Sequence, residues 1–104
     1  MENSKTMQNW LNKNINLGTI RVGQKQNIIF ESISPLDIKT ILTSCGCTVP
    51  KYDMGKKKLT VTYTPGTIPI HLRHQGFYSS RKTITIYYKT GETEVLSFNA
   101  KITN

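Results

Sequence analysis

The sequence predicts an all-β fold, and three observations lead to this prediction. Apolar and polar residues alternate in several short segments, as in strands that bury one face. Turn-forming residues recur roughly every 8–12 positions, a spacing typical of sandwiches. No segment with a helical pattern separates the strands, which disfavours a parallel βαβ architecture. We therefore expect a single immunoglobulin-like antiparallel β-sandwich of about seven strands, preceded by a short N-terminal arm.

The length of the chain, 104 residues, fits one domain. We assign residues 1–14 to the arm and residues 15–104 to the sandwich. No apolar run approaches the roughly 20 residues that a membrane span needs, so no membrane partner is expected. The first residues lack the apolar stretch of a secretory signal. Two cysteines are too few for a disulfide scaffold, which favours a reducing cytoplasm or a particle assembled there.

The arm contains the one segment with a helical pattern, residues 4–13. Ser4 is a suitable cap, and Met7, Trp10 and Leu11 are spaced for one helical face. Two interpretations remain open for this segment. It folds back on the core of its own domain, or it docks Trp10 on a neighbouring subunit, because tryptophan is enriched among binding anchors.

The first half of the sandwich reads as short strands separated by turn residues. Gly18 and Gly23 are expected to end the first two strands, and Pro35 to end the third. The expected strands are residues 15–17, 20–22, 26–33 and 37–43. Residues 49–50 and 53–55 are predicted to form a loop.

The second half begins with three lysines and then alternates strictly. Thr90-Gly91-Glu92 is expected to close a hairpin. The apolar positions expected to line the strands are Leu59, Val61 and Tyr63; Ile68, Ile70 and Leu72; Ile84, Ile86 and Tyr88; and Leu96, Phe98, Ala100 and Ile102.

Both cysteines lie in one short motif, Cys45-Gly46-Cys47. In an extended strand they share a face, unless Gly46 bends the chain. We weigh a strained, easily reduced disulfide, a zinc site completed by His71 and His74, and two free thiols with at least one buried. Free thiols are the expected state, because the cysteine spacing is short for zinc and the two histidines on a strand would point to opposite faces. No metal or cofactor is expected.

Catalysis is not expected. A nucleophilic cysteine needs a base that a third group orients, and no carboxylate is obviously placed to orient either histidine.

The charge balance favours an anionic partner, because 14 Lys and Arg side chains stand against 6 Asp and Glu, a net charge of +8. Solubility alone, or lysines that protect strand edges, explains such an excess equally well. Nucleic acid is a less favoured partner, because only Tyr52 and Tyr78 accompany the basic residues and no known binding motif is present. The candidate partner-binding residues are Met7, Trp10, Leu11, Lys56, Lys57, Lys58, Arg81 and Lys82.

One ordered set of segments is distinctive. It comprises Asn16-Leu17-Gly18-Thr19-Ile20, the strand with Phe30, the strand from Ile38 to Leu42, Ser44-Cys45-Gly46-Cys47-Thr48-Val49-Pro50, Val61-Thr62-Tyr63, Gly76-Phe77-Tyr78 and Lys82-Thr83-Ile84-Thr85-Ile86. In this order, the segments resemble those of a bacterial family of unknown function that is marked by a Ser-Cys-Gly-Cys-Thr motif. The resemblance covers residues 16–103 and implies an immunoglobulin-like sandwich, related in shape to pilus-chaperone and sperm-protein-like modules.

This sequence departs from that family in two ways. Members are usually exported or lipid-anchored, whereas no signal is seen here, and the loop after the motif is reduced to Asp53-Met54-Gly55. By analogy, a basic sandwich of this size resembles small auxiliary capsid proteins of tailed bacteriophages, including the crAss-like group. The expected function is then a non-enzymatic structural protein of a virion assembled in the host cytoplasm, with the major capsid protein or other virion proteins as partners. The alternatives are a cytoplasmic module that binds a protein or peptide at an open sheet edge, and a weak nucleic-acid binder.

Overall fold

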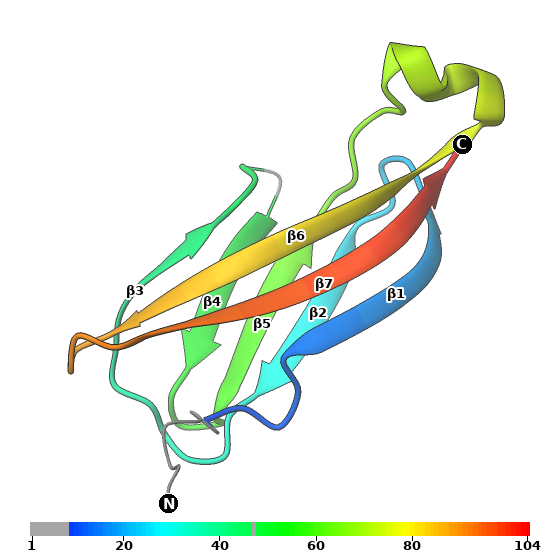
Figure 1. The fold of residues 1–104 in the computed structure, drawn as a ribbon. Coiled ribbons are helices and arrows are strands. Elements are labelled where there is room, and N and C mark those ends of the chain that lie inside the picture. The colour runs from blue at the N-terminus through cyan, green and yellow to red at the C-terminus, as the bar shows by residue number, and fades with distance from the viewer. Residues whose placement is uncertain (1–8, 47) are drawn as a thin grey trace, which may run out of the picture.

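The computed structural model describes residues 9–46 and 48–104, which form the predicted β-sandwich (Figure 1). Its described elements are β1 (Asn14–Arg21), β2 (Gln26–Glu31), β3 (Ile38–Thr43), β4 (Thr48–Asp53), β5 (Lys58–Tyr63), the 3₁₀-helix η1 (Ile70–Gln75), β6 (Phe77–Tyr88) and β7 (Thr93–Thr103). None of the helices in these residues is long and apolar enough to cross a membrane.

The seven strands of the described residues form two sheets. One has the order β1-β7-β6-β3 and lies in front in Figure 1, and the other has the order β2-β5-β4. All neighbouring strands run antiparallel except β1, which pairs with β7 in parallel. The first strand thus lies beside the last, and this pairing brings together segments about 80 residues apart in the sequence.

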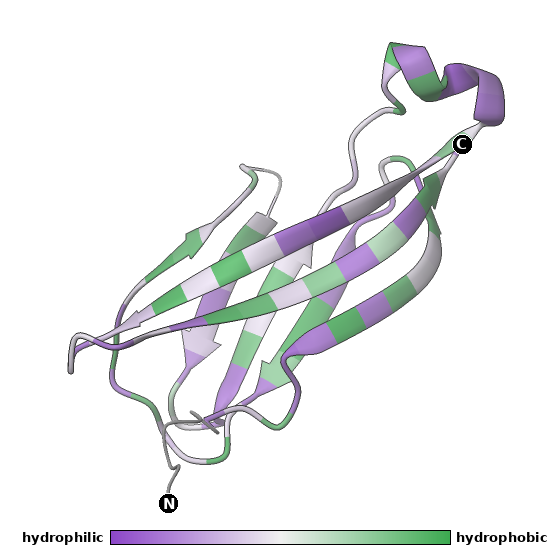
Figure 2. Ribbon diagram, viewed as in Figure 1, coloured by the Kyte–Doolittle hydropathy of each residue, from purple (hydrophilic) through white to green (hydrophobic). Residues whose placement is uncertain are grey.

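The alternation seen in the sequence sorts side chains between the core and the two outer faces. Hydrophilic and hydrophobic bands alternate along β1, β6 and β7 in Figure 2. Phe30, Leu59, Ile84, Ile86 and Leu96 are fully buried between the sheets. The predicted core of β5, β6 and β7 is therefore confirmed.

Two of the expected interruptions between strands lie within strands instead. The expected break at Gly18 is wrong, because β1 continues through it with a bulge between Asn16 and Thr19. Gly18 adopts a φ of 74°, which glycine alone reaches without a steric cost, so the strand absorbs the extra residue there. The loop expected around Val49-Pro50 is instead β4. A proline fits this strand because β4 lies at the edge of its sheet.

The strand expected over Ile68, Ile70 and Leu72 is also wrong, because η1 occupies residues 70–75. The amide of Leu72 donates to the carbonyl of Pro69, and Gly76 ends the turn with a φ of 76°. Proline before the turn and glycine after it outweigh the alternating pattern.

The predicted helix over residues 4–13 is not present in its described part. Trp10 forms an antiparallel bridge with Ser32, and the amide of Leu11 donates to the carbonyl of Glu31 at 2.8 Å. The chain at residues 9–11 therefore runs beside β2 in extended form. Residues 1–8, which include Ser4 and Met7, lie outside the described residues.

Candidate functional site

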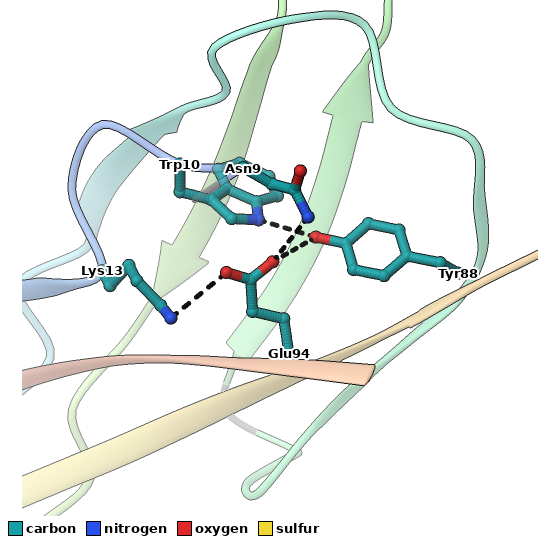
Figure 3. Close-up of polar contacts among 5 residues, drawn as sticks. All are labelled: Asn9, Trp10, Lys13, Tyr88 and Glu94. Atoms are coloured by element: carbon teal, nitrogen blue, oxygen red, sulfur yellow. Dashed lines mark hydrogen bonds and ion pairs between the residues drawn. The ribbon is translucent and has the colours of Figure 1, made fainter. Parts of the chain in front are cut away.

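A buried carboxylate organises one end of the sandwich. Glu94 points inward from β7, and its side chain is only 3% exposed. Its Oε1 accepts hydrogen bonds from the Tyr88 hydroxyl at 2.7 Å and from Asn9 Nδ2 at 3.1 Å, while Lys13 Nζ lies 3.1 Å from Oε2 (Figure 3). Oε2 accepts no hydrogen bond from the described residues, and its ion-pair partner among them is the Lys13 ammonium. We call Asn9, Trp10, Lys13, Tyr88 and Glu94 the Glu94 cluster.

Trp10 connects this cluster to both sheets. Its Nε1 donates to the Tyr88 hydroxyl on β6 at 2.9 Å, and its ring meets that of Tyr52 on β4 edge-on, with 5.9 Å between centroids. Only 2% of the residue is exposed. For residues 9–13 of the arm, the structure supports the interpretation in which the chain folds back on its own core. Trp10 is therefore not an exposed anchor, whereas its neighbour Leu11 is 68% exposed.

The Glu94 cluster acts as a structural clamp. Hydrogen bonds join Asn9, Trp10 and Tyr88 to one another or to Glu94 Oε1, and the ion pair with Lys13 compensates Oε2. Three of the five residues of the cluster come from residues 9–13. A buried charge that is paired and hydrogen-bonded is tolerated, but it specifies one arrangement because any other leaves it unpaired. The cluster thus fixes residues 9–13 against β6 and β7.

The cluster also predicts how stability depends on pH. Burial, followed by the hydrogen bond to Glu94, raises the pKa of the Tyr88 hydroxyl well above its ordinary value. Because the folded pKa exceeds the unfolded one, the contribution of Tyr88 is complete below about pH 10 and is lost as the pH rises further. We expect the free energy of unfolding to fall above about pH 10, and a Tyr88→Phe variant to lose less over the same range.

Urea denaturation at pH 8, 9, 10 and 11 tests this prediction. Burial also raises the pKa of Tyr78, so the free energy of unfolding of the Tyr88→Phe variant should still fall with pH, but less steeply. Equal slopes for the variant and the original chain would contradict the assignment.

The cysteine motif differs from its expected state. Cys45 is disulfide-bonded, so the expectation of free thiols is wrong at this residue. Its carbonyl accepts hydrogen bonds from Thr43 Oγ1 at 3.0 Å and from Thr48 Oγ1 at 2.6 Å, which turn the chain between β3 and β4. Gly46 is exposed beside it, and Cys47 lies outside the described residues.

The two histidines of the zinc hypothesis lie elsewhere. His71 and His74 are exposed on η1, three residues apart on a 3₁₀-helix, where such positions share a face. The expectation that they point to opposite faces of a strand is therefore wrong. Within the described residues, no group of three or more potential metal ligands occurs.

The predicted lysine cluster lies at the turn between β4 and β5. Lys56 and Lys57 form the turn, and Lys58 begins β5. Lys58 is flanked in register by Glu31 on β2 and Asp53 on β4, so acidic residues stand on both sides of it. Opposite charges across strands stabilise the sheet, so the charge of Lys58 is balanced locally.

The outer face of the four-stranded sheet is not balanced in this way. Its four strands contain a single acidic residue, Glu94, and that residue points inward and is buried. Arg21, Arg81 and Lys101 are exposed on these strands. The ion pairs of the described residues join Lys13 to Glu94 and Lys89 to Asp37, so neither Arg81 nor Lys101 has a carboxylate partner there.

A groove of about 470 Å³ crosses this face over β1, β7 and β6. Hydrophilic bands of the three strands lie side by side in Figure 2. Two registered rows, Asn16–Asn99–Arg81 and Thr19–Lys101–Ser79, supply its outward side chains. The bulge at Gly18 opens its β1 side, where the Gly18 amide donates to Asn16 Oδ1 at 2.8 Å. Lys101 Nζ lies 4.2 Å from the centroid of the Phe77 ring.

Sequence reasoning found only part of this groove. It selected Arg81 but paired it with Lys82, which is half-buried opposite Phe98 and so belongs to the inner side. It missed Lys101 and Asn99. The signal that marks them is their place between Phe98, Ala100 and Ile102 in the last strand, because alternation sends them to the outer face.

All four sheet edges carry features that hinder the addition of another strand. β1 has the bulge at Gly18, and β3 has one between Ile38 and Thr40. β4 contains Pro50, and on β2 the Asn12 side chain donates to the carbonyl of Ile29 and accepts from the amide of Glu31. Bulges, proline and covered edges are the means by which sheets avoid pairing with other chains.

Comparisons with known proteins agree with the fold. Residues 8–102 match the model of a family described as "Protein of unknown function (DUF1573)". No curated protein matches the sequence significantly. Among solved structures, a point mutant of the SrpA adhesin from Streptococcus sanguinis superposes with a TM-score of 0.50 and 13% sequence identity. The match covers 82% of this chain and 54% of the adhesin chain, so the chain spans about half the length of that protein. At this identity, the likeness concerns the fold alone.

Proposed function

The chain belongs to the DUF1573 family of proteins of unknown function, and we propose that it is a non-enzymatic structural module that binds an anionic protein surface. The observation that carries this proposal is the outer face of the four-stranded sheet, which exposes Arg21, Arg81 and Lys101 without an exposed carboxylate on its strands. A surface with one sign of charge attracts partners of the opposite sign and orients them on approach.

In its most specific form, the proposal is an auxiliary or decoration protein on the capsid of a tailed bacteriophage, with the major capsid protein as partner. This form rests on the analogy with small sandwiches that cover capsid lattices. A rigid sandwich suits such a role, because a preformed surface loses little conformational freedom on binding. The virion is the corresponding location.

Binding through the sheet face is favoured over strand addition at a sheet edge. Strand addition needs a row of accessible backbone groups. Bulges interrupt β1 and β3, Pro50 lies in β4, and Asn12 covers part of β2. The outer face of the four-stranded sheet offers a broad surface without such obstacles.

Mass spectrometry of gradient-purified phage particles tests the capsid proposal. We expect the protein in the particles at a fixed, high copy number relative to the major capsid protein, and retained through repeated purification. Absence from the particles contradicts the capsid form. Retention of one specific host protein by the full-length chain, in place of particle association, favours the alternative of a cytoplasmic binding module.

A further inference from the structure

We propose that the groove over β1, β7 and β6 is a carboxylate-binding site, and that it receives Asp or Glu side chains from an acidic segment of the partner. This inference deepens the proposed function, because it names the contact through which the anionic surface is recognised. The groove holds two cationic side chains, Arg81 and Lys101, and the nine described residues that line it include no acidic one.

The two cations differ in the contacts that they offer. Arg81 lies in register with Asn99 and Asn16, so a guanidinium and two amides stand in one row across three strands. The planar guanidinium pairs with a carboxylate through two parallel hydrogen bonds, and side-chain amides are able to bond the peptide groups beside it. This row matches the chemistry of an acidic residue within a polypeptide.

Lys101 forms the centre of the second row, between Thr19 and Ser79. The Phe77 ring lies 4.2 Å from its ammonium, and this contact restrains the side chain on the sheet. The neighbouring hydroxyls are further donors for an anionic oxygen. A second carboxylate, or the same one in a different orientation, would find its partners here.

The groove fits a polypeptide better than a nucleic acid. Single-stranded nucleic acids bind where exposed aromatic rings offer stacking surfaces among basic residues. The aromatic residue beside these cations is Phe77, and Lys101 already lies over its ring. None of the described residues that line the groove is aromatic.

The test uses the full-length chain and a capped hexaglutamate peptide, with binding followed by calorimetry and by amide shifts in NMR spectra at low salt. Comparison ligands are hexaglutamine, inorganic phosphate and a twelve-residue oligothymidine. The groove variant is the double substitution Arg81→Gln and Lys101→Gln. The matched control is Lys56→Gln with Lys57→Gln, which removes the same charge at the β4–β5 turn.

We expect hexaglutamate to shift the amides of Asn16, Asn99 and Arg81, and the groove variant to bind it about tenfold more weakly or worse, because charge-assisted contacts are lost. The control variant should change affinity less than about twofold, since distant surface charges act only through a screened field. Hexaglutamine should not bind.

Equal losses in the two variants would overturn the site, because they would indicate unspecific attraction to net charge. If phosphate or oligothymidine bound in the groove more tightly than hexaglutamate, the choice of a carboxylate as the ligand would be overturned. Peptide binding without particle association would leave the groove standing and reject the capsid proposal. If the groove variant still associated with particles, the capsid proposal would stand and the groove would be rejected as the site of contact.

Discussion

Replacing Trp10 by alanine is expected to lower the free energy of unfolding by about 3–5 kcal/mol, the usual cost of removing a large buried aromatic side chain. Trp10 is 2% exposed, packs edge-on against Tyr52, and donates to the Tyr88 hydroxyl. The substitution leaves a cavity between the sheets and removes one buried hydrogen bond. For a domain of this size, the loss corresponds to a midpoint of thermal unfolding lower by about 15 °C or more.

The matched control for this prediction is Leu11→Ala. Leu11 is the next residue but is 68% exposed, so its truncation should change stability by less than about 0.5 kcal/mol. Urea denaturation followed by circular dichroism measures both variants. If Trp10→Ala kept full stability but lost association with particles, Trp10 would be a docking anchor and the clamp would be refuted.

Replacing Glu94 by alanine is expected to cost about 3 kcal/mol, because one buried carboxylate compensates several groups at once. Its removal deprives the Tyr88 hydroxyl and the Asn9 amide of their acceptor and leaves Lys13 without its counter-ion. Lys13 is 36% exposed and recovers some hydration, whereas Tyr88 is buried and does not.

Glu94→Gln is the control that separates shape from charge. The amide oxygen of glutamine still accepts hydrogen bonds from Tyr88 and Asn9, and only the ion pair with Lys13 is lost. We expect a cost of about 1 kcal/mol, in the range of partly exposed ion pairs. Equal costs for the alanine and glutamine variants, measured by denaturation at pH 7, would mean that the ion pair and not the hydrogen-bond network stabilises the clamp.

Sequence patterns predicted the strands that alternate strictly and failed where local signals competed. Leu59, Val61 and Tyr63 were placed correctly on one face, because a strand covered on one side must alternate. The run Ile68-Pro69-Ile70 also alternates, yet the backbone there turns into η1. The apolar alternation of this run does not correspond to a strand, because Pro69 before η1 and Gly76 after it favour a turn of the backbone.

The candidate site was only partly predictable, because charge neutralisation depends on neighbours across strands. Lys58 looked like part of a basic patch, but Glu31 and Asp53 lie on either side of it in the folded sheet. Arg81 and Lys101 looked unrelated in sequence, but adjacent strands bring both to one groove. The disulfide at Cys45 is disfavoured by the geometry of a straight strand, so the sequence pattern predicts free thiols there.

The amino-acid sequence is enough to predict the class of fold, the buried face of most strands and the excess of positive charge. These properties follow from the identity and spacing of nearby residues, which local sterics and burial translate directly into structure. Only the folded arrangement shows that Trp10 is enclosed, that Lys58 has an acidic neighbour on each side, and that no exposed carboxylate lies on the strands of the four-stranded sheet. Each of these depends on which strands lie side by side, and the pairing of β1 with β7 joins residues from opposite ends of the chain.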